Sequence, residues 1–193
     1  VALVPVELGS LVALVPVELG SLVALVLMSR STTPSPNEGK GVGCLPFGVL
    51  PVLEVDGKVV GQSMAIARYL AKEFGLAGKD AWENLQCDML VDTLSDLRQD
   101  PVKKEEKKHI LIKETIPYYL KKFENVLNEN NGFFVGGAVT WTDLVFAVSL
   151  ESFEAIFGKE ALDSYPTLKS FKERIFNLPN IRAWIQKRPV TEH

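Results

Sequence analysis

The sequence has few of the residues that build metal sites or disulfide frameworks. Among its 193 residues there are only two cysteines and two histidines. Cys44 and Cys87 lie far apart without C-x-x-C spacing, which argues against a disulfide scaffold or zinc site and fits a reducing, cytoplasmic compartment. His109 lies in a charged run and His193 ends the chain, so we expect both to be solvent-exposed. The sequence therefore predicts no metal site.

Charge of one sign and long apolar runs are also scarce. The formal net charge is only −3, while 47% of the residues are hydrophobic. A slightly acidic chain is a poor candidate for nucleic-acid binding, and this hydrophobic content does not suggest disorder. Neither Leu8–Val17 nor Leu19–Met28 approaches the roughly 20 apolar residues that a membrane-spanning helix needs. We therefore expect a globular chain without a membrane span.

Residues 1–43 differ from the rest of the chain. VALVPVELGSL at 1–11 recurs unchanged at 12–22, and VALV at 23–26 begins a third copy. Solenoid repeats drift in sequence and are usually longer, so this identity indicates a recent duplication or a misassembled segment. A genuine anchor or interaction segment is the alternative. The Ser-, Thr-, Pro- and Gly-rich residues 29–43 predict a flexible linker.

From Cys44 onward the pattern predicts a β-hairpin followed by a helix. Residues 50–55 and 58–62 are short runs rich in β-branched residues, and Asp56-Gly57 between them favours a type I′ turn. Ser63 precedes apolar residues at helical spacing, so we expect its hydroxyl to cap a helix that runs to about Phe74. Gly75 is expected to stop this helix.

The hairpin–helix pattern also predicts a binding site. Pro51 stands at a strand start, where its missing N–H removes no ladder hydrogen bond. A cis Leu50–Pro51 bond would leave the backbone groups of Leu50 free to pair with an extended peptide. Unpaired amides at the start of the Ser63 helix favour a carboxylate. Together these features predict a site for a small acidic peptide.

Residues 76–193 have the periodicity of an all-helical domain. Thr140 and Asp143 have the spacing of a capping box with Asp in the Glu position, and Pro117 is expected to kink or restart a helix. Residues 166–176 and 178–187 predict two further helices, with Trp184 packed inward. Five apolar residues at helical spacing predict a core-facing stripe: Trp82, Leu85, Met89, Leu94 and Leu97.

Several of these stretches resemble a known family. LPFGVLPVLEVDG and QSMAIARYLAKEFGLAGKD resemble the glutathione-binding half of sigma-class glutathione transferases, and NLQCDMLVDTLSDL, VTWTDL and LPNIRAWIQKRP resemble the helical half. The wording is most similar to the insect enzymes, with haematopoietic prostaglandin D synthase a more distant relative. The resemblance runs from about Leu45 to the C-terminus. It implies an α+β fold in which an incomplete thioredoxin-like module at 44–75 precedes an all-helical domain at 76–193.

The resemblance also assigns the site. It implies that Leu50 and Pro51 bond the cysteinyl backbone of glutathione, and that Gln62 and Ser63 hold its γ-glutamyl carboxylate with Val49 beside them. It further implies a homodimer in which Asp96 reaches the γ-glutamyl amine bound by the neighbouring subunit. The glutathione-binding positions are thus Val49, Leu50, Pro51, Gln62, Ser63 and Asp96.

The activity implied by the resemblance is the attack of the glutathione thiolate on a hydrophobic electrophile, with glutathione as co-substrate and no metal. The family uses a tyrosine hydroxyl just after the first strand of the thioredoxin-like domain. The four tyrosines of this chain lie elsewhere: Tyr69, Tyr118, Tyr119 and Tyr165. No catalytic residue is therefore assigned, and weak or absent conjugation is expected from the chain as written. The alternatives are a non-enzymatic glutathione- or ligand-binding or structural protein on the same scaffold, and a product that does not fold stably.

Overall fold

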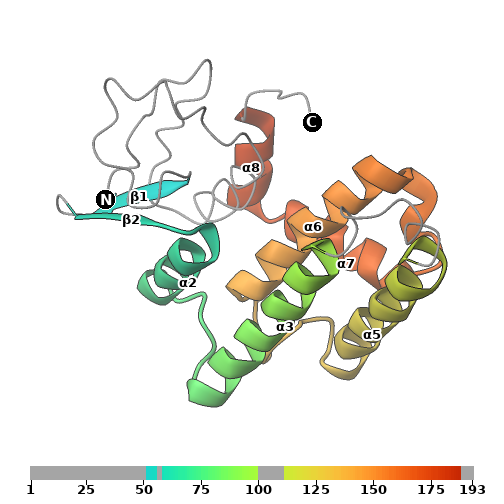
Figure 1. Ribbon diagram of the computed structural model, residues 1–193. Helices are drawn as coiled ribbons and strands as arrows, with labels where there is room; N and C mark the ends of the chain where they lie inside the picture. Colours follow the sequence, from blue (N-terminus) through green and yellow to red (C-terminus); the bar gives the residue numbers. More distant parts are fainter. Residues whose placement is uncertain (1–50, 56–57, 100–110, 188–193) are drawn as a thin grey trace. The chain divides into compact units, whose positions relative to one another are not determined.

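The computed structural model describes residues 51–55, 58–99 and 111–187, which belong to two compact units (Figure 1). The first unit comprises the chain up to Gly75 and from Leu178 onward, and the second comprises Leu76–Asn177. A two-stranded antiparallel sheet precedes a mostly helical chain. The predicted α+β class is therefore confirmed. No described helix is both long enough and apolar enough to cross a membrane.

The predicted hairpin is present in the first unit. Strand β1 (Val52–Val55) pairs antiparallel with β2 (Lys58–Gly61), and Val55 lies opposite Lys58. This register leaves a two-residue connection, as the Asp56-Gly57 pattern predicts, although the turn itself lies outside the described residues.

Helix α2 (Ser63–Glu73) follows the hairpin and ends where the sequence predicts. Its buried face consists of Ile66, Ala67, Leu70 and Ala71. The Phe74 amide donates to the Leu70 carbonyl at 3.0 Å, and Gly75 has a φ of 68°, which an L-residue adopts only at a cost. The same unit contains α8 (Pro179–Lys187), in which Ile181 is fully buried and Trp184 is half-buried.

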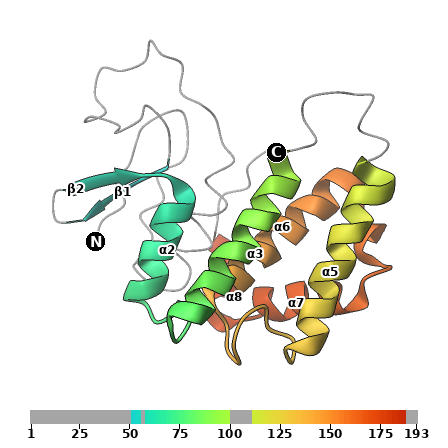
Figure 2. The ribbon, with the colours of Figure 1, turned by 60° about the horizontal axis from the view of Figure 1, so that its bottom comes forward.

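The second unit is built around helix α6 (Trp141–Phe157), and every residue from Trp141 to Leu150 is buried. Helices α3 and α7 pack against α6, and α5 packs against α7 (Figures 1 and 2). A helix that is apolar on all sides is stable only in such a central position. The bounds of its neighbours are Ala81–Gln99 for α3, Ile116–Glu129 for α5 and Pro166–Phe176 for α7.

Aromatic rings from several elements fill the centre of this unit. Phe146 of α6 lies 3.8 Å from Phe134 and 4.8 Å from Phe123 of α5, measured between ring centroids. Phe171 of α7 lies 5.1 Å from Phe134 in an edge-to-face arrangement. Such pairs add to the stabilisation that their burial gives. This cluster joins α5, α6 and α7 in one core.

The predicted capping box starts α6. The Asp143 carboxylate accepts hydrogen bonds from the Thr140 amide at 2.7 Å, the Thr140 hydroxyl at 2.8 Å and the Phe134 amide at 3.1 Å. Burial raises the pKa of Asp143, and these hydrogen bonds oppose the rise because they favour the carboxylate. One side chain therefore satisfies the helix start and the preceding loop together.

The remaining helix predictions are also confirmed. Pro117 lies in the first turn of α5, directly after a short π-helical turn at Leu111–Thr115, so the helix restarts there. Helices α7 and α8 occupy the two predicted stretches. The Glu124 side chain of α5 accepts the Thr167 amide at the start of α7, at 3.2 Å, and so ties these helices together.

The predicted core-facing stripe of α3 is wrong for its first three members. Trp82, Leu85 and Met89 are 67%, 56% and 57% exposed. The residues that α3 buries are instead Cys87, Leu90, Val91 and Leu94. Met89 and Leu94 point about 140° apart on an α-helix, so the five predicted residues never formed one face. Helix α3 is apolar on two faces, and only one of them lies in the core.

Replacing Asp143 by Asn should destabilise the protein by about 1–3 kcal/mol, because two backbone amides and a hydroxyl lose a charged acceptor in a buried place. The free energy of unfolding in urea measures this loss. The matched control is Asp163→Asn, since Asp163 is exposed and pairs only with Lys169 at the surface. That change should cost less than about 1 kcal/mol. Equal losses for the two variants would contradict the role given to Asp143.

Candidate functional site

The candidate site lies where β2 passes into α2. Gln62, between the two elements, has φ 73° and ψ 104°, and its carbonyl accepts the Ile66 amide at 3.0 Å. Gln62 is therefore the N-cap and Ser63 is the first helical residue. The prediction that the Ser63 hydroxyl caps the helix is wrong, because a capping side chain belongs to the residue before the first helical one.

The start of α2 is left without a protein cap. The Gln62 side chain makes no capping hydrogen bond, and the first turn contains no acidic residue. The first amides of a helix have no partner within it, and the helix dipole places partial positive charge there. Gln62 is exposed and Ser63 is half-buried. The arrangement favours a bound anion, and a carboxylate most simply.

The backbone of Gln62 supports a functional interpretation. Among the described residues only Gln62 and Asn131 combine a side chain with a positive φ. Asn tolerates this conformation, whereas in Gln it stores strain of about 1–3 kcal/mol. Such strain persists where binding or catalysis requires a particular geometry. Sequence reasoning missed it because Gly61, which adopts this conformation freely, stands one position earlier.

The other predicted site residues are partly within the described chain. Pro51 is buried and directly precedes β1, which confirms its position at a strand start. Val49 and Leu50 lie outside the described residues, so the cis Leu50–Pro51 bond stays a prediction. Asp96 is exposed on α3 in the second unit.

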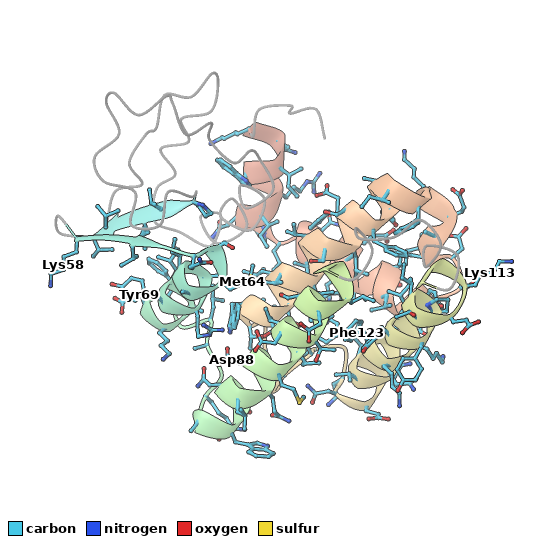
Figure 3. The ribbon with its side chains drawn as sticks, in the orientation of Figure 1. Lys58, Met64, Tyr69, Asp88, Lys113 and Phe123 are labelled. Carbon is cyan, nitrogen blue, oxygen red and sulfur yellow. The ribbon has the colours of Figure 1, made fainter. Side chains whose placement is uncertain are left out.

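The first unit also contains an apolar groove, of about 460 Å³, between the hairpin and α2. Lys58 at the loop end of the hairpin and Tyr69 on α2 lie toward the same side of this unit, and Met64 lies on the other flank of α2 (Figure 3). Sequence reasoning missed this groove, although the alternation of β2 and the i, i+4 spacing of α2 place its lining on one side. That lining is Val55, Lys58 and Val60 from the hairpin and Ala65, Ile66 and Tyr69 from α2.

No group of three or more His, Cys, Asp or Glu side chains within the described ranges is arranged to hold a metal ion. The features that remain for chemistry are the uncapped start of α2 and the neighbouring groove.

Comparison with known proteins identifies the class. The profile of the glutathione S-transferase N-terminal domain matches residues 43–72, and that of the C-terminal domain matches residues 89–188. A glutathione S-transferase of Anopheles gambiae is 43% identical over 157 residues, covering 77% of both chains. Hematopoietic prostaglandin D synthase of Gallus gallus is 40% identical over 158 residues, covering 76% of both.

Solved structures agree with this class. Prostaglandin synthase D of Nilaparvata lugens superposes with a TM-score of 0.68 at 41% identity, over 76% of this chain and 77% of that one. A glutathione S-transferase of Necator americanus, described as monomeric, has a TM-score of 0.67 at 33% identity, over 77% and 78% of the two chains. The chain belongs to the glutathione S-transferase family.

If Gln62 is strained, Gln62→Gly should raise the free energy of unfolding by up to about 1 kcal/mol, because glycine adopts a positive φ without steric cost. Urea unfolding measures the change. The control Gln86→Gly, inside α3, should lower stability by about 1 kcal/mol. A loss of similar size at both positions would contradict the strain at Gln62.

Proposed function

We propose that the protein is a sigma-class glutathione transferase that binds glutathione at the start of α2 and directs its thiolate at hydrophobic electrophiles. The observation that carries this proposal is the uncapped first turn of α2 beside the strained Gln62. In a family named for glutathione, an open anion site at the Gln62–Ser63 pair is best explained by the γ-glutamyl carboxylate.

The proposed binding mode assigns one role to each end of the tripeptide. The amides of the first turn of α2 and the Ser63 hydroxyl donate to the γ-glutamyl carboxylate, and the Gln62 side chain lies beside it. Leu50 and Pro51 pair with the cysteinyl backbone by strand addition, with Val49 next to them. The position of Pro51 directly before β1 supports this mode, because an extended peptide alongside would continue the antiparallel pattern.

The chemistry of such a site is the supply of a thiolate. A free thiol has a pKa near ~8.5, so a small fraction is ionised at neutral pH. A hydroxyl that donates to the sulfur increases that fraction because it stabilises the charged form. Tyr69, Tyr118, Tyr119 and Tyr165 lie on or beside helices α2, α5 and α7 rather than after a first strand. Their positions favour the alternative that the chain as written is a glutathione- or ligand-binding or structural protein without efficient turnover.

We further propose that the protein acts in the cytoplasm as a homodimer in which Asp96 of one subunit binds the γ-glutamyl amine held by the other. The exposure of Asp96 on α3 supports this role, because a side chain that serves a neighbouring subunit must point out of its own.

Ser63→Ala should weaken glutathione binding at least about tenfold, since a hydrogen bond to a charged group contributes roughly 1.5–3 kcal/mol. Titration calorimetry of the full chain with reduced glutathione gives the dissociation constant. Ser170→Ala is the matched control, because Ser170 is exposed on α7, outside the proposed site. Equal affinity of the Ser63 variant and the parent chain would contradict the site.

The parent chain of 193 residues should conjugate an aryl halide weakly or not at all, even where it binds glutathione, because no tyrosine occupies the expected position. Initial rates at saturating glutathione measure this, with an Anopheles gambiae glutathione S-transferase as the positive control. Conjugation at the rate of that enzyme would contradict the expectation and remove the support for the non-enzymatic alternative.

A further inference from the structure

The exposed apolar residues of α3 form one continuous stripe. Successive residues of a helix are rotated by about 100°, which places Trp82, Leu85 and Met89 on one side with Asp92 and Asp96, all within about 80°. The three apolar side chains are each more than half exposed, and both carboxylates are exposed as well. Apolar side chains grouped in this way mark an interaction surface. We call these five residues the α3 stripe.

The groove between the hairpin and α2 is a second apolar surface with space for a partner. Two of its lining side chains, Val60 and Tyr69, are 46% and 39% exposed. Within the first unit no described side chain fills the groove, which has a volume of about 460 Å³. The two surfaces therefore share an apolar character and large exposed side chains.

The two surfaces also carry opposite charge. The α3 stripe continues from its apolar half into Asp92 and Asp96. The groove is lined by Lys58, and Lys72 lies one turn beyond Tyr69 on the same face of α2. Opposite charges arranged around apolar centres favour one pairing over others. Since every chain carries both surfaces, the partner that fits them is a second copy of this chain.

We propose that the α3 stripe of one copy lies in the hairpin–α2 groove of a second copy, and that two-fold symmetry makes this contact twice. The proposal rests on the proposed homodimer and names its two surfaces.

The spacing of residues along the two helices fixes the direction of the contact. Met89 and Asp96 are separated by about 10 Å along α3, and Tyr69 and Ser63 by about 9 Å along α2. With α3 antiparallel to the α2 of the other copy and Met89 beside Tyr69, Asp96 lies at the start of that α2. A carboxylate then stands next to an anion site. An α-amino acid group needs both, because it presents a carboxylate and an ammonium together.

The test uses the full chain and measures its mass in solution by analytical ultracentrifugation. Met89→Asp and Tyr69→Asp should each weaken self-association at least a hundredfold, because each places a carboxylate in an apolar contact made twice. Ile156→Asp is the matched control, since Ile156 is 72% exposed on α6, outside both surfaces, and this variant should remain a dimer. Circular dichroism confirms that each variant is folded.

Two outcomes would overturn the proposal at this stage: a parent chain that is monomeric, or Met89 and Tyr69 variants that dimerise like the control. Open assemblies larger than a dimer would contradict the two-fold arrangement.

Mixing the two disrupted variants tests whether these surfaces meet each other. A heterodimer of Met89→Asp with Tyr69→Asp retains one intact contact of the two, so the mixture should associate more strongly than either variant alone. A mixture that associates no better than its components contradicts this pairing.

Glutathione binding separates this inference from the proposed function. Asp96→Asn should remain a dimer but bind glutathione about tenfold more weakly, whereas Met89→Asp should lose both dimerisation and affinity. A dimer disrupted by Met89→Asp that never binds glutathione contradicts the proposed function and leaves the interface standing. An Asp96 variant that binds like the parent contradicts the predicted direction of the contact.

Discussion

The helical unit depends on the burial of α6, and the burial of α6 depends on the Asp143 carboxylate. Because every residue from Trp141 to Leu150 is buried, the amides at the start of this helix cannot rely on water. Asp143 receives the Thr140 amide and hydroxyl and also the Phe134 amide of the preceding loop. Phe134 is thereby held against Phe146, in the aromatic core that joins α5, α6 and α7.

The start of α2 meets the same physical requirement in the opposite way. Where α6 supplies its own carboxylate at the third helical position, α2 has no acidic residue in its first turn, and Gln62 makes no side-chain cap. A helix start without a cap loses about 1 kcal/mol of stability, and the backbone of Gln62 adds strain. Stability given up at one place in an otherwise well-capped fold is most simply explained by a ligand that supplies the missing carboxylate.

The sequence predicted the features that depend on neighbouring residues. Asp56-Gly57 between β-branched runs, Gly75 after a helical pattern and the Thr140–Asp143 spacing each describe a few consecutive backbone positions, and each was confirmed in the elements that they begin, join or end. The orientation of α3 was not predictable in this way, because both of its faces are apolar and the core selects between them. The positive φ of Gln62 has no sequence signal either, since a glycine stands beside it. The anion site was therefore predicted in the right place with the wrong cap.

The exposed face of α3 explains why oligomeric state need not follow from family. The family includes a structure described as monomeric, so each member's surface decides. Burying the exposed half of Trp82, Leu85 and Met89 contributes about 1–2 kcal/mol for each residue. One such contact is comparable to the cost of association, about 4–15 kcal/mol, and two contacts related by symmetry reach further into that range. A single stripe in a single groove would thus be marginal, and the two-fold arrangement, together with Val60 and Tyr69, turns a marginal contact into a stable one.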